Sequence, residues 1–151
     1  MTERTVLRLG DPRLCQRSRL VSQFGTAELE ALIEDLRDTM ASRDGAGLAA
    51  PQIGIPLRLV IFGIGVNPRY PDAPPIPETV LINPEITPLD QARESGWEGC
   101  LSVPGLRGQV SRWSRIHVQG FDARGQRTEE GSSRPAGCCR GRAARAPAAA
   151  R

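Results

Sequence analysis

The chain has 151 residues, a length that fits one domain with a core of its own. Its apolar runs stay far below the roughly 18 residues that a membrane-spanning helix needs, which argues against a helical membrane protein. The net charge is +3, but residues 134–151 hold five arginines and no acidic residue, so the rest carries 15 arginines against 17 acidic residues, a net of −2. This mildly acidic body argues against a nucleic-acid-binding domain.

The N-terminal residues and the cysteines predict a cytoplasmic protein. The sequence reaches domain-like character at Val6 without an apolar signal region or an amphipathic presequence. The four cysteines, two of which are adjacent, show no disulfide-framework spacing. We therefore expect a reducing compartment and no membrane association.

An amphipathic helix is predicted over residues 26–42. Thr26 is a suitable N-cap, and the Asp44-Gly45 pair is expected to end the helix because glycine tolerates a positive φ. The apolar residues recur at the spacing of one helical face: Leu29, Leu32, Ile33, Leu36 and Met40.

Three short strands are predicted in the remainder of the chain. They cover residues 57–64, residues 79–83 with Pro84 closing the strand, and residues 116–121 followed by a turn at 122–125. Helix and strands without a regular βαβ alternation predict an α+β domain.

The composition changes near residue 132. Of the 18 residues 134–151, 16 are Ala, Arg, Gly or Pro, and the other two are Cys138 and Cys139. This stretch has no aliphatic side chain larger than alanine to face a core. We therefore divide the chain into a domain of residues 1–131 and a low-complexity tail of residues 132–151.

The segment GAGLAAPQ, residues 45–52, has the composition of a tight backbone turn beside a ligand. Its two glycines allow close approach, and Gln52 offers two N–H donors suited to an oxygen that becomes negative when a carbonyl is attacked. Removing one such donor typically raises the barrier by about 3–4 kcal/mol. A simple glycine turn with an incidental glutamine is the alternative.

The segment EGCLS, residues 98–102, offers a thiol. A thiolate is a good ligand for a divalent transition metal, and Cys100 follows a glycine that permits close approach. An inert buried cysteine is the alternative for any isolated Cys.

Together the two segments resemble the first two signatures of the peptide deformylases, in the same order and at a similar separation. The resemblance runs from VLRLGDP (residues 6–12) through LINP (81–84) to VQGFD (118–122) and predicts antiparallel sheets around a helix. It implies that Cys100 is a metal ligand, that Gln52 and the Leu101 amide hold the oxyanion, and that Glu98 borders the site. It also implies that Ala46, Gly47 and Gly99 hold the peptide backbone by strand addition.

The resemblance implies metal-assisted hydrolysis of the N-formyl group from formylmethionine at the start of new proteins. In this family one Cys and two His hold ferrous iron, or zinc or nickel in its place, and a Glu between the histidines takes a proton from the metal-bound water. The partners implied are formylmethionyl peptides and nascent chains at the ribosome.

The family's third signature, a helical His-Glu-x-x-His, does not occur in these 151 residues. The single histidine, His117, is not followed by Glu, and the alternation Ile116-His117-Val118 predicts that it faces away from the core. Completion of the metal site by Cys138 and Cys139 is a weaker alternative, because adjacent residues rarely reach one ion together. We therefore expect the family's central C-terminal helix to be lost and the chain to be inactive.

A change of reading frame near residues 130–134 is our hypothesis for this difference. Ala, Arg, Gly and Pro are encoded by GC-rich codons, and every lysine-or-arginine position of the chain, 20 in all, is arginine, as a GC-rich gene favours.

Two other functions are alternatives: a non-catalytic relative that binds N-terminal peptides, and an RNA- or ribosome-binding protein that uses the arginine tail. The tail lacks aromatic residues for stacking, so no specific nucleic acid is expected.

Overall fold

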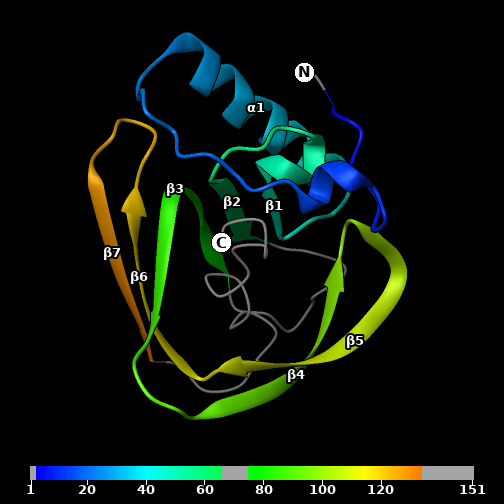
Figure 1. Cartoon of the computed structure of the whole chain (residues 1–151), viewed down its shortest axis with the longest axis vertical. Helices are drawn as coiled ribbons and strands as arrows, with labels where there is room; N and C mark the ends of the chain where they lie inside the picture. The colour runs from blue at the N-terminus through cyan, green and yellow to red at the C-terminus, as the bar shows by residue number, and fades with distance from the viewer. Residues whose placement is uncertain (1–2, 66–74, 134–151) are drawn as a thin grey trace.

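The computed structural model describes residues 3–65 and 75–133, which form an α+β structure with antiparallel strands (Figure 1). The predicted fold class is therefore confirmed. In chain order the elements are the 3-10 helix η1 (Pro12–Cys15), α1 (Ala27–Ser42), β1 (Gly47–Ala49), the 3-10 helix η2 (Ala50–Ile53), β2 (Leu59–Ile64), β3 (Ile76–Pro88), β4 (Arg93–Cys100), β5 (Val103–Trp113), β6 (Arg115–Phe121) and β7 (Arg127–Ser133).

Helix α1 confirms the prediction from periodicity. The Thr26 hydroxyl oxygen accepts a hydrogen bond from the Leu29 N–H at 3.2 Å, which satisfies one of the free donors of the first turn. Of the five predicted core residues, Leu32 is partly buried, and the fully buried ones are Leu29, Ile33, Leu36 and Met40.

The end of α1 differs from the prediction in one respect. Asp44, not Gly45, takes the positive φ, at 47°. The Gly45 N–H donates to the Met40 carbonyl at 2.9 Å and closes the last turn. A glycine at position 45 is favoured for a different reason: a Cβ there would lie only 3.0 Å from Leu101 Cδ1.

The main sheet has the strand order β1-β2-β3-β6-β7, and both of its faces are buried around β2. Leu59 and Ile61 point to the same side as α1 and join its core cluster. Val60 and Phe62 point to the other side, in a second cluster with Leu81, Ile116 and Val118. Burial on both faces explains why the 59–64 segment reads as a continuous apolar run.

Strand β3 continues past Pro84, where the sequence predicted its end. The register of β3 against β6 shifts between Ile82 and Glu85, and Asn83 takes a φ of 51°. This bulge places the proline where the ladder does not need its missing N–H. The Asn83 side chain forms two hydrogen bonds with the Val21 backbone, each 2.9 Å long, and so ties the segment before α1 to the sheet.

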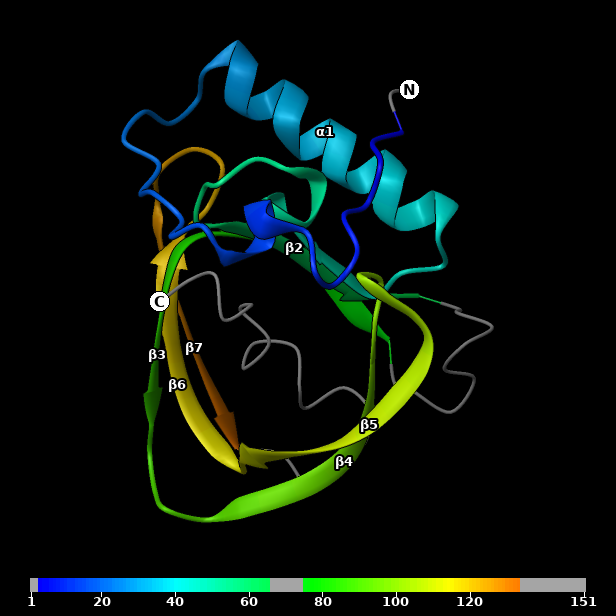
Figure 2. The ribbon, with the colours of Figure 1, turned by 45° about the vertical axis from the view of Figure 1, so that its right-hand side comes forward.

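Strands β4 and β5 form a separate two-stranded sheet, and Figure 1 shows this hairpin curving from the ends of β3 and β6 back toward β1 and η2. The second view shows the same bowl-like curvature (Figure 2). Most residues of both strands are exposed or half-buried, so no alternation of apolar and polar residues marks them in the sequence. Strands β1 and β7 are also present and were not predicted.

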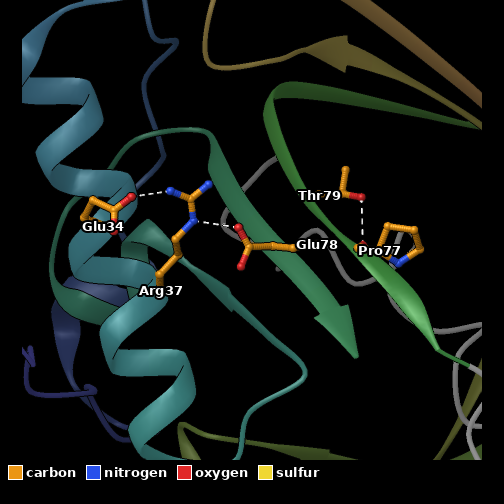
Figure 3. Close-up of polar contacts among 5 residues, drawn as sticks. All are labelled: Glu34, Arg37, Pro77, Glu78 and Thr79. Atoms are coloured by element: carbon orange, nitrogen blue, oxygen red, sulfur yellow. Dashed lines mark hydrogen bonds and ion pairs between the residues drawn. The ribbon is translucent and has the colours of Figure 1, made fainter. Parts of the chain in front are cut away.

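An exposed ion pair connects α1 with the start of β3, and a second pair lies within α1 (Figure 3). Arg37 Nε lies 2.6 Å from Glu78 Oε1, and Arg37 also pairs with Glu34 one helical turn earlier. The Thr79 hydroxyl donates to the Pro77 carbonyl at 3.2 Å. Gly63 lies beneath this point, where a Cβ would approach Glu78 Cα to 2.7 Å, so β2 and β3 meet here only because residue 63 has no side chain.

The low-complexity tail, Cys138 and Cys139, and the expected loss of a C-terminal helix fall almost entirely outside the described residues. Within those residues, no helix is long and apolar enough to cross a membrane.

Candidate active site

Residues 45–52 connect α1 to β2 through β1 and η2. The side-chain oxygen of Gln52 accepts a hydrogen bond from the Ala49 N–H at 3.0 Å, which folds the glutamine back over the start of η2. Ala49 is 2% exposed and Ala50 is fully buried. The two small residues therefore occupy tightly packed positions, and the turn directs the Gln52 amide.

Residues 98–102 form the end of β4 and the turn into β5. The register against β5 shifts between Gly99, opposite Arg107, and Cys100, opposite Val103. Such a shift redirects the side chains that follow it. Cys100 is exposed, so the alternative of an inert buried cysteine does not apply, whereas Ser102 is only 6% exposed.

The two segments meet at Gln52 and Cys100, which are 48 residues apart in the sequence. Gln52 Nε2 lies 3.6 Å from Cys100 Sγ and donates to Ser102 Oγ at 3.1 Å. A Cβ on Gly45 would lie 3.0 Å from Leu101 Cδ1, and the Leu101 side chain packs against the α1 core cluster. Five residues of the two motifs thus lie in one small region of the structure.

Residues 7–9, which belong to neither motif, form hydrogen bonds with both of them. The sequence did not predict this role. The Leu7 N–H donates to the Gln52 carbonyl at 2.7 Å, and the Leu9 N–H donates to the Ser102 carbonyl at 2.8 Å. Backbone contacts of this kind leave no side-chain pattern from which they might have been predicted. Residues 7–9 therefore fix the spacing between η2 and the β4–β5 turn.

Glu98 is held by an ion pair across the hairpin. Its carboxylate accepts from Arg112 Nη2 at 3.1 Å and from Arg112 Nε at 3.3 Å. The Glu98 side chain is 14% exposed and that of Arg112 is 39% exposed. This two-point contact fixes the carboxylate two residues before Cys100.

Strand β1 lies at the edge of its sheet, which bears on the residues expected to hold a peptide. The Ala46 carbonyl accepts from the Gly63 N–H at 3.2 Å, and Gly47 lies opposite Phe62 in the ladder. Because paired residues alternate in an antiparallel ladder, the Gly47 N–H and C=O are directed away from β2, toward the side on which no other described strand pairs with β1. A Cβ on Gly47 would lie 3.3 Å from Phe62 Cβ.

His117 does not join this region. It lies in β6, on the face opposite to buried Ile116 and Val118, as predicted from the alternation, although it is half-buried rather than fully exposed. Strand β6 is three positions from β1 in the sheet, a separation of about 14 Å at the usual strand spacing. In residues 3–65 and 75–133 no group of three or more His, Cys, Asp or Glu side chains is placed to hold a metal ion.

The residues present therefore do not fit a deformylase metal centre. The described part of the chain supplies one exposed thiol at the site, Cys100, and the chain's only histidine lies in β6. A catalytic transition-metal ion usually takes three protein ligands and keeps a fourth position for water. The described residues fall short of that number, because Cys100 is the one such ligand at the site.

An α+β fold that brings the amide N–H donor of Gln52 beside the Cys100 thiol fits the class of amide hydrolases. A sequence profile of the family described as Polypeptide deformylase matches residues 3–138. Peptide deformylase 1 of Nitrosomonas europaea is 61% identical over 120 residues, which make up 80% of this chain and 68% of that protein. Peptide deformylase 2 of Ralstonia nicotianae is 59% identical over 122 residues, 81% of this chain and 69% of that protein.

The solved structures agree with the sequence comparisons. A Met-Ala-Ser-bound class I type b peptide deformylase from Acinetobacter baumannii superposes with a TM-score of 0.82 at 36% identity, covering 87% of this chain and 84% of that one. The chain therefore belongs to the peptide deformylase family.

Proposed function

We propose that this chain is a peptide deformylase by descent whose 151 residues form the substrate side of the site but do not sustain hydrolysis. The observation that carries the proposal is the pairing of Gln52 with Cys100 in a chain whose single histidine lies on β6. Gln52 supplies an oxyanion donor and Cys100 supplies one metal ligand. The two histidine ligands and the glutamate between them that the family uses do not occur in the 151 residues.

The proposed substrate class is the formylated N-terminus of a newly made protein, in the cytoplasm. Support for it comes from the family membership and from the A. baumannii relative, whose structure holds Met-Ala-Ser. In this proposal the peptide backbone pairs with the edge of β1 at Gly47, with Ala46 and Gly99 beside it, and the formyl oxygen meets Gln52 and the Leu101 N–H. Ferrous iron, zinc or nickel is the ion that the family's chemistry calls for.

Formate release tests the catalytic part of the proposal. The purified chain, incubated anaerobically with ferrous iron and formyl-Met-Ala-Ser, is expected to release no more formate than a Cys100→Ser variant. Cys15→Ser, at the other exposed cysteine of the described residues, is the matched control for the loss of a thiol. Stoichiometric iron bound through Cys100, together with formate release above the Cys100→Ser rate, would show the proposal to be wrong.

Binding of N-terminal peptides without turnover is the second candidate function, and the position of β1 as the edge strand among the described strands favours it. Titration with formyl-Met-Ala-Ser, followed by NMR of the backbone amides, is expected to shift Gly47 and its neighbours in β1. Peptide binding without formate release would favour this candidate, and unchanged β1 resonances at millimolar peptide would reject it.

We also propose that the folded domain ends near residue 131 and that a change of reading frame accounts for the tail. The β6–β7 ladder, which pairs Arg115 with Ser133, supports a domain that reaches at least to the end of β7, and the family match extends to residue 138. The hypothesis predicts that another frame of the same DNA encodes His-Glu-x-x-His downstream of codon 130. Sequencing of that region decides it, since a stretch with no such motif in any frame contradicts the hypothesis.

A further inference from the structure

We propose that Ser102 is a positioning residue for the oxyanion donor: its buried hydroxyl fixes the Gln52 amide so that the NH2 group faces Cys100. The inference deepens the proposed function, since it concerns the same site. Ser102 is neither the metal ligand nor the oxyanion donor that the two motifs imply. Its proposed role follows from its contact with Gln52.

The orientation of the Gln52 amide is determined by its two partners. The Ala49 N–H is a donor only, so the group 3.0 Å from it must be the amide oxygen and not the nitrogen. Nε2 is then left at the other end, 3.1 Å from Ser102 Oγ. A flip of the amide would place its nitrogen at the Ala49 N–H, where it cannot accept a hydrogen bond, so the Ala49 contact sets the orientation and the Ser102 contact holds the other end of the group in place.

The second N–H of Gln52 is the one directed to the Cys100 side of the site. Nε2 carries two hydrogens, and with one bound to Ser102 Oγ the other is on the side of Cys100 Sγ, 3.6 Å away. A donor fixed before the reaction does not have to reorganise when charge develops on the substrate oxygen. Ser102 therefore holds the NH2 group in the position from which its second hydrogen faces Cys100.

Burial makes this contact hard to replace. Ser102 is 6% exposed, so a water molecule has little access to the place of its hydroxyl. The backbones of both residues are also fixed by the same N-terminal segment, through the hydrogen bonds from Leu7 to Gln52 and from Leu9 to Ser102. Loss of the Ser102 hydroxyl is therefore expected to free the Gln52 amide while the turn stays in place.

Side-chain NMR relaxation of the Gln52 amide tests the proposal without any metal or turnover, with a Gln52→Met variant assigning its resonances. In the unmodified chain the order parameter is expected near the value of a rigid backbone, about 0.85, and in Ser102→Ala below about 0.6. Ser102→Thr, which keeps the hydroxyl, is expected to restore it. Ser111→Ala, at an exposed serine of β5, is the matched control and should leave it unchanged.

A Gln52 order parameter that does not fall in Ser102→Ala would overturn the proposal. It would also be overturned if the backbone amides of residues 100–103 lost order to the same extent, because Ser102 would then support only the turn. The result is independent of whether the chain releases formate. If formate release is found, Ser102→Ala should lower kcat about 10- to 100-fold with KM retained, below the 100- to 1,000-fold loss typical for removing a donor outright; an unchanged kcat would reject the role.

Discussion

Gly45 and Leu101 are in such close contact that a side chain at residue 45 would force its neighbours to shift by a few tenths of an ångström. A Cβ at position 45 would lie 3.0 Å from Leu101 Cδ1 and 3.1 Å from the Met40 carbonyl oxygen. Leu101 in turn packs against the cluster formed by α1 and the sheet. The first glycine of the GAGLAAPQ motif therefore sets the distance between the helix end and the β4–β5 turn that carries Cys100.

Replacing Gly45 with alanine is expected to destabilise the chain by about 1–3 kcal/mol, because an added methyl group in a packed region forces its neighbours to move. Urea denaturation followed by circular dichroism measures the change. Gly96→Ala is the control, since a Cβ there meets no atom within 4 Å and its φ is not positive. A Gly45→Ala variant as stable as Gly96→Ala would contradict the close contact.

Replacing Asn83 with alanine is expected to cost about 2–4 kcal/mol. The change removes both hydrogen bonds to the Val21 backbone, which is buried, and leaves an alanine at a φ of 51°. Asn83→Gly, which relieves the backbone strain but not the lost hydrogen bonds, separates the two causes by denaturant unfolding. If Asn83→Gly is as stable as the unmodified chain, the contacts with Val21 contribute nothing.

The pairing of Arg37 with Glu78 is expected to contribute little stability. The two side chains are 38% and 42% exposed, and ion pairs at that exposure typically contribute less than about 1 kcal/mol. The Glu78 contact, with a smaller part from Glu34, raises the pKa of Arg37, so the guanidinium stays charged at every usable pH. Glu78→Gln should change the unfolding midpoint slightly, and by less in 1 M salt; a loss above 2 kcal/mol would contradict this.

Asp11 should titrate well below an ordinary aspartate. Hydrogen bonds from the Arg13 side chain and backbone lower the pKa of Asp11 from 3.8 to about 2. Because the folded pKa is depressed, the contact stabilises the fold above about pH 4, and that contribution is lost as the pH falls from about 4 toward 2. NMR titration of the Asp11 carboxyl carbon measures it, and Arg13→Ala should return the pKa toward 3.8.

Sequence alone was sufficient where a residue's neighbours lie close along the chain. The helix over residues 27–42, its Thr26 cap and the strand at 59–64 follow from spacing and local chemistry, since apolar periodicity and capping act within a few residues. The turn at 122–125 is of the same kind: the Asp122 carboxylate accepts from the N–H groups of Arg124 and Gln126. The family resemblance, and not any local pattern, predicted that Gln52 and Cys100 belong to one site.

Tertiary structure alone decided the features that join distant segments. The bulge at Asn83 carries β3 past a proline that would otherwise end a strand, and its partner Val21 is 62 residues away. The β4–β5 hairpin is polar and rich in glycine, so its strands are defined by pairing with each other and not by an apolar face. The contacts of Leu7 and Leu9 with the two motifs are made by backbone atoms, which every residue except proline carries in the same form. Side-chain sequence cannot specify such contacts by itself, and only the folded chain shows which backbone groups meet.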